Sequence, residues 1–438
     1  MDLFTQIIMF VLIISVLVIL HELGHFIPAK LFKTKVEKFY LFFDVKFSLF
    51  KKKIGETVYG IGWLPLGGYV KIAGMIDESM DTDQMKEEPK PWEFRSKPAW
   101  QRLIIMLGGV TVNFLLAWAI YTFMLYKYGD SYIPSKSLKY GIEVDSIGEK
   151  LGLKTGDRIL AVDGKESKRF NEAVLDIILG DEVTIERDGD EVTIPLTDEG
   201  KRIVFQTQGR NFITYRSKPR IAIVSDSSVA QLSGMLPGDE ILEVNRTPIN
   251  YWDEFRNKIQ SSANQSLNIT VRRDGKNEEL SLIVPKEGKI GIVLDFQDLT
   301  TTDKFGFIEA IPAGFTRTIK VLTDQVRQFK VIFNSETGAY KQVKGPIGIV
   351  ELMPTSWDWT FFWGFMAMFS VWLAFINVLP IPALDGGHVM FLLYEIVSGR
   401  SPSQKVLEKG QIVGFILLMG LMLLVFGNDI WNIIKRFI

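Results

Sequence analysis

The stretch Ile7-Ile-Met-Phe-Val-Leu-Ile-Ile-Ser-Val-Leu-Val-Ile-Leu-His21-Glu22-Leu-Gly-His25 decides the fold of this chain. Every residue from Ile7 to Leu20 is apolar except Ser15. A helix needs roughly 20 such residues to cross the ~30 Å hydrocarbon core of a membrane, and the apolar run around this stretch is long enough. Ionisable residues end the run, and such residues inside a membrane span indicate a functional site by default.

Further apolar runs of similar length follow. Together with the first run they lie near residues 5–27, 102–126, 357–380 and 411–431. Polar and charged sequence fills the interval 130–300. The pattern predicts a polytopic α-helical membrane protein with about four transmembrane helices and a soluble insert between the second and third. The first run lacks a basic leading region and a small-residue cleavage site, so we interpret it as a retained span rather than a secretory signal.

Composition limits the chemistry. The 438 residues contain no cysteine, which excludes a disulfide framework, a thiolate metal site and a cysteine nucleophile. Any metal ligands must therefore be His, Asp or Glu side chains. The net charge of −1 gives no reason to expect a nucleic-acid partner.

Basic residues predict the orientation of the chain in the membrane. The loop after the first span carries many lysines, including the run 51–53, whereas residues 1–6 contain none. By the positive-inside rule this loop is cytoplasmic and the N-terminus lies outside. The insert at 130–300, one span later, is then also outside. Lys435 and Arg436 would lie outside as well, which is a mild departure from the rule.

The insert repeats itself. Gly152-Leu-Lys-Thr-Gly-Asp-Arg-Ile-Leu-Ala-Val-Asp163 is matched by Gly234-Met-Leu-Pro-Gly-Asp-Glu-Ile-Leu-Glu-Val-Asn245. Each copy is followed by a hairpin signal, Arg187-Asp-Gly189 in the first and Arg273-Asp-Gly275 in the second, flanked by Val, Ile and Thr. Two related β-rich modules in tandem are therefore expected.

These patterns divide the chain into five parts. They are a membrane part at 1–129, β-rich modules at 130–213 and 214–296, an amphipathic linker region at 297–356 and a second membrane part at 357–438. Strands broken by glycines around 42–73 predict a membrane-associated β-hairpin. Apolar residues at helical spacing in 305–333 predict a helix on the outer membrane face, and a helix packed on the β-rich modules explains the spacing equally well.

The segment His21-Glu22-Leu-Gly-His25 is a metal-binding pattern. Residues i and i+4 share one face of a helix, so His21 and His25 can coordinate one Zn²⁺ while Glu22 reaches the metal-bound water. The alternative is that both histidines are helix-end residues that hydrogen-bond to water at the membrane interface. The neighbourhood of the third histidine of the chain, His388, favours the metal site.

His388 ends the stretch Asn377-Val-Leu-Pro-Ile-Pro-Ala-Leu-Asp385-Gly-Gly-His388. Pro380 and Pro382 must break the third span there, and irregular backbone at membrane depth is tolerated only beside protein or a wet cavity. Both spans run from outside to inside, and a rise of ~1.5 Å per residue brings His21 and Asp385 to similar depths. Asp385 can supply a third ligand, which leaves the fourth zinc position open for water.

The metal-binding pattern in the first span, combined with Asn377-x-x-Pro-x-Pro-x-Leu-Asp385-Gly in a later one, resembles the site-2 protease family. The repeated Gly-x-x-x-Gly-Asp-x-Ile-Leu-x-Val of the insert resembles PDZ domains. Together they make the chain most similar to the RseP-type regulators of sigma-E protease. The resemblance covers nearly the whole chain, including Phe94–Arg102 and the following Leu107–Asn113.

The resemblance implies zinc-dependent hydrolysis of peptide bonds in single-pass transmembrane segments, with Glu22 as the catalytic base. The substrates it implies are anti-sigma factors already shortened by a first protease, and remnant signal peptides. It also implies a bacterial inner membrane, an active site near the cytoplasmic leaflet, and PDZ domains on the periplasmic side whose grooves could take peptide C-termini. Asn377 would help to hold substrate or the developing oxyanion, and capping of the broken helix is an equally open alternative.

A transmembrane substrate hides its peptide bonds and must unwind before attack. An exposed edge strand can pair with an unwound segment through backbone hydrogen bonds, and Tyr59–Val70 is suited to this role. The candidate substrate-binding residues there are Tyr59, Gly60, Ile61, Gly62, Pro65, Gly67 and Gly68. The family is described as having a membrane-reentrant β-hairpin at this place, and a plain cytoplasmic hairpin is the alternative.

Two other classes of function are alternatives to the protease. A non-enzymatic, membrane-tethered PDZ scaffold would need neither acid nor imidazole inside the bilayer, and a zinc assay separates it from the protease. An ion or proton carrier could use Glu22, His25 and Asp385 as a relay. That hypothesis predicts flux without peptide cleavage.

Overall fold

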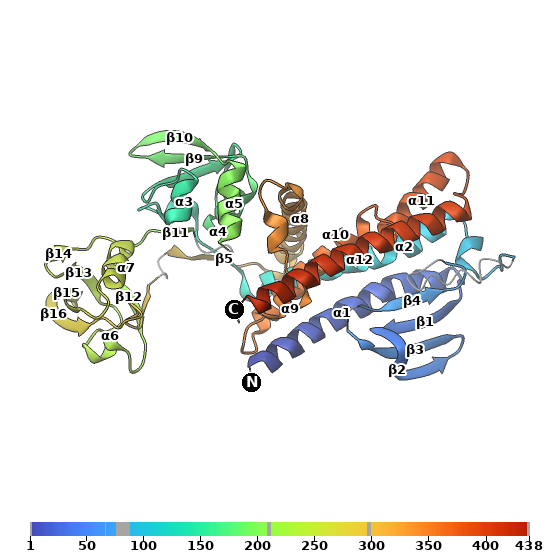
Figure 1. The fold of residues 1–438 in the computed structure, drawn as a ribbon, viewed down its shortest axis with the longest axis horizontal. Coiled ribbons are helices and arrows are strands. Elements are labelled where there is room, and N and C mark those ends of the chain that lie inside the picture. The colour runs from blue at the N-terminus through green and yellow to red at the C-terminus, as the bar shows by residue number, and fades with distance from the viewer. Residues whose placement is uncertain (1, 66, 76–87, 208–211, 296–298, 436–438) are drawn as a thin grey trace. The chain divides into compact units, whose positions relative to one another are not determined.

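The computed structural model describes residues 2–65, 67–75, 88–207, 212–295 and 299–435, which form two compact units (Figure 1). The first unit comprises Met1–Gly129, Lys304–Arg327 and Val343–Ile438, and the second comprises Asp130–Asp303 and Gln328–Gln342. The first unit holds the long apolar helices, and the second holds the repeated insert.

The described part of the first unit contains four helices long and apolar enough to cross a membrane. They are α1 (Asp2–Leu31), α2 (Ala99–Tyr128), α10 (Trp359–Val378) and α12 (Gln404–Ile434). Each overlaps one of the apolar runs, so the prediction of four helices long and apolar enough to span a membrane is confirmed. The start of α10 is set by Asp358, whose carboxylate accepts hydrogen bonds from the backbone N–H groups of Thr360 and Phe361 at 2.8 and 3.0 Å.

The buried face of α1 is a row of residues four apart. Met9, Ile13 and Leu17 are fully buried and pack in one apolar cluster with side chains of α2 and α10. Because residues i and i+4 lie on the same helix face, this row continues directly into His21 and His25. The metal-binding pattern of α1 therefore faces the neighbouring helices.

The third span breaks where the prolines predict. Helix α10 ends at Val378, and a short helix, α11 (Asp385–Ser398), begins seven positions later. The chain between them lies tightly against its neighbours: a Cβ on Gly386 would lie 2.2 Å from the carbonyl oxygen of Leu379. On α12, a Cβ on Gly414 would lie 1.5 Å from the carbonyl oxygen of Pro382. These glycines allow the broken backbone to be enclosed by protein.

A four-stranded sheet follows α1. Its strands are β1 (Val36–Leu41), β2 (Phe43–Ile54), β3 (Thr57–Leu64) and β4 (Tyr69–Ile72), in the order β2-β3-β1-β4. Strands β2 and β3 form an antiparallel hairpin, while β1 pairs parallel with β3 and antiparallel with β4. Val36, Val70 and Ile72 pack in a cluster with Ile105 and Met106 of α2. The sheet is thereby anchored beside the helix pair α1–α2.

The sheet corrects one expectation about Tyr59–Gly62. These residues lie on β3, which is paired on both sides: Tyr59 lies opposite Lys52 of β2 and Phe39 of β1. The prediction of an exposed edge is wrong for Tyr59–Ile61, because β1 occupies the side that a two-stranded hairpin would leave open. Among the described residues, the edge strands are β2 and β4. Leu66, within the same segment, lies outside the described residues.

Two helices that are not part of the four apolar runs also contact the spans. In the first half of α8 (Phe307–Phe333), the carbonyl of Ile311 accepts a 2.8 Å hydrogen bond from the Trp118 indole of α2, and the Phe315 ring lies 5.4 Å from that indole. The short helix α9 (Pro346–Val350) is capped from α12, since the Asp429 carboxylate accepts the N–H groups of Gly345, Ile347 and Gly348 at 2.9–3.1 Å.

The second unit contains two β-rich modules with separate apolar cores. The first holds β6 (Ile142–Val144), α3 (Ser146–Lys150), β7 (Arg158–Val162), β8 (Lys165–Glu166), α4 (Phe170–Leu179), β9 (Glu182–Arg187), β10 (Asp190–Pro195), α5 (Asp198–Gln206) and β11 (Ile213–Tyr215). The second holds β12 (Ile221–Val224), α6 (Val229–Leu232), β13 (Glu240–Val244), β14 (Thr247–Pro248), α7 (Trp252–Ser261), β15 (Ser266–Arg273), β16 (Lys276–Ile283) and β17 (Ile292–Leu294). Their main sheets have matching strand orders, β10-β9-β7-β8 in the first module and β16-β15-β13-β14 in the second. Strands β5 (Asp130–Tyr132) and β18 (Thr301–Asp303) pair where the unit joins the rest of the chain.

The repeat extends to individual hydrogen bonds. Arg187 donates to both carboxylate oxygens of the buried Asp157 at 2.8 and 2.7 Å, and Arg273 does the same to Asp239 at the same two distances. These bonds raise the pKa of both guanidinium groups above its ordinary value. The predicted sequence repeat therefore corresponds to a repeated fold. The expected boundary at 296 lies outside the described residues.

Candidate metal centre and active site

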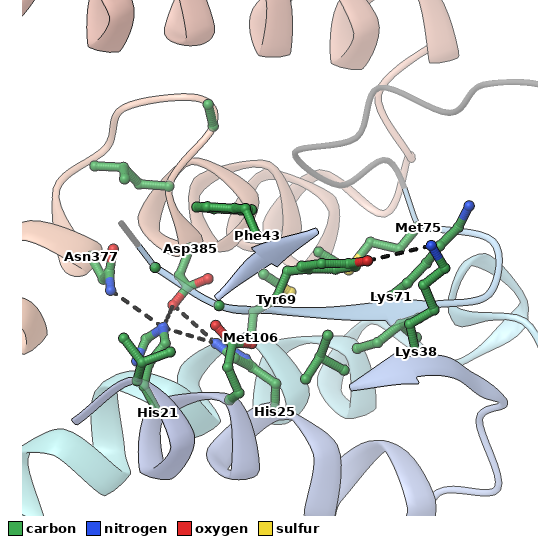
Figure 2. A pocket seen from close by; sticks show the side chains of 18 of the residues that line it. His21, His25, Lys38, Phe43, Tyr69, Lys71, Met75, Met106, Asn377 and Asp385 are labelled. Atoms are coloured by element: carbon green, nitrogen blue, oxygen red, sulfur yellow. Dashed lines mark hydrogen bonds and ion pairs between the residues drawn. The ribbon is translucent and has the colours of Figure 1, made fainter. Parts of the chain in front are cut away.

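Five of the polar residues expected from the sequence meet at one cavity of the first unit, of about 520 Å³ (Figure 2). His21 and His25 come from the buried row of α1, Glu22 from the position after His21, Asn377 from the last turn of α10, and Asp385 from the first turn of α11. The proline break between α10 and α11 is what allows the last two side chains to reach the same cavity.

Three side-chain atoms of this group form a nearly equilateral triangle. The Nε2 atoms of His21 and His25 are 3.4 Å apart, and they lie 3.5 and 3.3 Å from Oδ2 of Asp385. A tetrahedral zinc ion with ligand distances of about 2.0–2.1 Å requires its ligand atoms to be about 3.3–3.4 Å apart. One ion could therefore contact all three atoms with little movement of the side chains.

The hydrogen bonding of Asp385 also fits a metal. Its Oδ2 atom is buried and accepts no hydrogen bond, although a buried carboxylate oxygen normally has a partner. This orphaned atom is the one that faces the two imidazoles. A divalent cation at the centre of the triangle would satisfy it, so the side chains present fit a zinc ion.

Helix α2 shapes the space around the imidazoles. The His25 Nδ1 atom lies 2.8 Å from the carbonyl oxygen of Ile105, and a hydrogen bond donated there leaves Nε2 free to bind a metal. One turn further on, Gly109 has no side chain to fill the space: a Cβ there would lie 2.4 Å from Nε2 of His25. The sequence Leu107-Gly-Gly is thus suited to admitting both rings.

Glu22 and Asn377 lie beside the triangle. Glu22 lines the cavity next to Gly68, whose Cβ, if present, would be 3.7 Å from Cγ of Glu22. The amide nitrogen of Asn377 lies 3.4 Å from Nε2 of His21, as the dashed line in Figure 2 marks. A group bound at the metal would therefore have a carboxylate and an amide within reach.

The wall of the cavity nearest the sheet is formed by β4 and the residues before it. Gly67, Gly68 and Tyr69–Ile72 line the cavity, whereas Tyr59–Gly62 and Pro65 do not. Of the candidate substrate-binding residues in Tyr59–Val70, the structure thus brings the last two glycines to the site. The others lie on β3 or, in the case of Pro65, in the connection between β3 and β4.

Three features of the site were not expected from the sequence. They are the fully buried Asn113 on α2, the buried Gln411 on α12 and the edge position of β4. A carboxamide within an apolar run, in the middle for Asn113 and at the start for Gln411, is the signal that could have indicated the two side chains. His388 lines the cavity but does not belong to the group of ligand atoms found among the described residues.

Comparison with known proteins identifies the family. The model of peptidase family M50 matches residues 9–421. The chain belongs to peptidase family M50. It is a zinc-dependent metalloprotease of the site-2 type and a membrane protein, as the resemblance and the four apolar helices predict.

Curated relatives of this M50 protease match it almost end to end. The regulator of sigma-E protease RseP of Escherichia coli is 28% identical, with 96% of this chain and 97% of the relative covered. The regulator of sigma E protease of Haemophilus influenzae is 28% identical over the same shares. A Vibrio cholerae protein provisionally named a zinc metalloprotease is 29% identical, with 98% and 99% covered.

Proposed function

We propose that this M50 protease cuts peptide bonds within single-pass membrane segments, with zinc held by His21, His25 and Asp385. The observation that carries the proposal is the triangle of ligand atoms, 3.3–3.5 Å on each side, in a cavity beside Glu22. When bound, the metal lowers the pKa of a coordinated water towards ~7 and polarises the carbonyl under attack.

The chain's own residues do the remaining chemistry. Glu22 accepts the proton of the attacking water and returns it to the leaving amine. Asn377 donates an amide hydrogen bond to the oxygen on which negative charge develops. Its side chain lies towards His21, at 3.4 Å, which favours this role over capping the last turn of α10.

We propose that β4 receives the unwound substrate. Among the described residues β4 pairs only with β1, so it lies at the edge of the sheet, where an extended segment can be added as a further strand. Gly67 and Gly68 continue this edge along the cavity wall to the side chain of Glu22. Tyr59, Gly60, Ile61, Gly62 and Pro65 then support the sheet without contacting the substrate.

We propose the following location and substrates for the protein. The protein lies in the bacterial inner membrane with the metal centre near the cytoplasmic leaflet, and the two β-rich modules are PDZ domains on the periplasmic side. Anti-sigma factors shortened by a first protease and remnant signal peptides are the substrates, which agrees with the names of the sigma-E relatives. The chain is divided into five parts, with boundaries after 129, 213, 296 and 356.

The test is cleavage by the purified, zinc-loaded protein in detergent or proteoliposomes. Two single-span peptides are compared, one with a uniform polyleucine span and one with Gly and Asn at mid-span, which loosen the helix. The proposal expects zinc-dependent cuts inside the span, faster in the loosened peptide, as mapped by mass spectrometry. Cuts only outside the span, or equal cutting without zinc, would contradict it. A scaffold would bind without cutting, and a carrier would conduct ions without cutting.

A further inference from the structure

Asn113 is the polar member of a row on α2 that faces the metal-binding turn of α1. Ile105, Gly109 and Asn113 are four residues apart, so they share one face of the helix. The carbonyl of Ile105 lies against His25, and the missing side chain of Gly109 leaves room for both rings. Asn113 is completely buried at the end of this row, next to His21.

The contacts of the Asn113 carboxamide are incomplete. Its Nδ2 atom lies 3.2 Å from Nδ1 of His21, while its Oδ1 atom is buried and has no hydrogen-bond partner. A buried amide oxygen without a partner is energetically unfavourable, because it has lost its hydrogen bonds to water. The two ends of a carboxamide are nearly identical in shape, and a half-turn about Cβ–Cγ exchanges them.

The tautomer of His21 decides which end must face the ring. A neutral imidazole carries one proton, and Nε2 of His21 is the atom that points at Asp385 and His25. If Nε2 binds the metal, the proton is on Nδ1, and Nδ1 then needs an acceptor. The Nδ2 group of Asn113 can only donate, whereas its Oδ1 atom can accept.

We infer that Asn113 is a positioning residue for the metal centre, with its Oδ1 accepting the Nδ1–H of His21. The inference rests on the proposed ligand set. It makes α2 the source of both outer hydrogen bonds, because the carbonyl of Ile105 holds His25 in the same way. Such partners fix the tautomer and the ring orientation of a ligand and raise its affinity for the metal.

The test compares two variants of the full-length protein by competition with a chelator. Asn113→Leu keeps the branched shape at Cγ, although it is larger, and has no acceptor, so its zinc affinity should fall ~10–100-fold. Asn113→Asp can accept but cannot donate, so it should keep wild-type affinity or exceed it. Loss of zinc in the aspartate variant would mean that donation from Nδ2 matters, and it would overturn the inference even if the leucine variant did not fold.

Ser370→Ala is the matched control. Ser370 is equally buried, and its hydroxyl donates to the backbone carbonyl of Asn113 at 2.7 Å, so the variant disturbs the same helix contact without touching His21. It should bind zinc normally. If its zinc affinity falls as much as that of Asn113→Leu, the effect of Asn113→Leu comes from disturbed helix packing and not from the lost acceptor. Unchanged zinc affinity in Asn113→Leu would mean that another acceptor, such as the carbonyl of Gly109, suffices.

A final variant separates this inference from the proposed function. His21→Ala should lose zinc if the ligand set is right. If His21→Ala loses zinc and Asn113→Leu does not, the positioning role is wrong and the ligand set stands. If His21→Ala keeps full affinity, the ligand set itself is wrong.

Discussion

The backbones of Gly24 on α1 and Gly108 on α2 meet without any side chain between them. A Cβ on Gly108 would lie 1.9 Å from the carbonyl oxygen of Gly24, and one on Gly24 would lie 2.4 Å from the carbonyl oxygen of Gly108. Small residues at such crossings allow membrane helices to approach closely. Because Gly24 is adjacent to His25, this crossing sets how far the imidazoles lie from the α2 groups that hold them.

Substituting Gly108 should therefore disturb the metal centre. Gly108→Ala forces α1 and α2 apart, and overpacking of this kind costs roughly 1–3 kcal/mol. We expect a lower melting temperature and weaker zinc binding, measured by thermal unfolding in detergent and by metal analysis after a chelator wash. Gly420→Ala on α12 is the control, since a Cβ there meets nothing within 4 Å. Wild-type zinc retention in Gly108→Ala would show that the crossing does not control the site.

Asp429 should contribute to stability but not to zinc binding. It accepts three backbone N–H groups at the start of α9, and Asp429→Ala leaves these donors without a partner, at a cost of roughly 1–3 kcal/mol. Asp429→Asn keeps one acceptor oxygen and should lie between the two. Thermal unfolding gives the order of stability, and zinc content should be equal in all three proteins. If the alanine variant is as stable as wild type, the hydrogen bonds of Asp429 to the start of α9 do not stabilise the protein.

The two β-rich modules should respond equally to equivalent substitutions. Arg187→Met leaves the buried Asp157 unpaired, and Arg273→Met does the same to Asp239, so each should destabilise its own module by roughly 3–5 kcal/mol. Arg158→Ala is the control, because its pair with Glu186 is exposed and worth at most about 1 kcal/mol. Hydrogen exchange resolved by peptide measures each module within the intact chain. Protection lost in one module only would show that the repeated pair is not equivalent in energy.

Removing the insert tests whether it controls access. Strands β5 and β18 pair antiparallel, with Tyr132 opposite Thr301, so a short Asn-Gly turn can replace residues 133–300 while keeping this ladder. If the insert excludes bulky substrates, the shortened protein should cut a trimmed substrate as before and should also cut the untrimmed one. If the insert instead recruits new C-termini, cleavage of the trimmed substrate should fall. If the shortened protein still fails to cut the untrimmed substrate, the insert does not exclude substrates by their size.

Local patterns in the sequence are sufficient to predict the spans and to predict which side chains gather at much of the candidate site. His21 and His25 share a helix face because of their spacing alone, and the two prolines before Asp385 predict the break that turns this carboxylate inward. Length and apolarity predict the spans in the same way. Spacing, prolines and apolar length are all read within one segment, without knowing which other segment packs against it.

The parts that the sequence did not predict depend on distant pairing. Whether Tyr59 lies on an edge or inside a sheet depends on β1, and no local pattern reports that β1 inserts beside β3. The significance of Asn113 depends on the rotation of α2 against α1, which packing over the whole helix decides. Edge position and outer hydrogen bonds therefore became visible only when the chain was folded.

In the proposed mechanism one zinc ion, held by the triangle of ligands, works with Glu22 as the base. The most direct measurement is zinc content and cleavage, made on the same preparations of Glu22→Gln and Asp385→Ala. Glutamine keeps the size of Glu22 but cannot accept the proton, so Glu22→Gln should bind zinc at the wild-type level and show no cleavage. Asp385→Ala should lose both zinc and cleavage. Substantial cleavage by Glu22→Gln, or full zinc content in Asp385→Ala, would contradict the account.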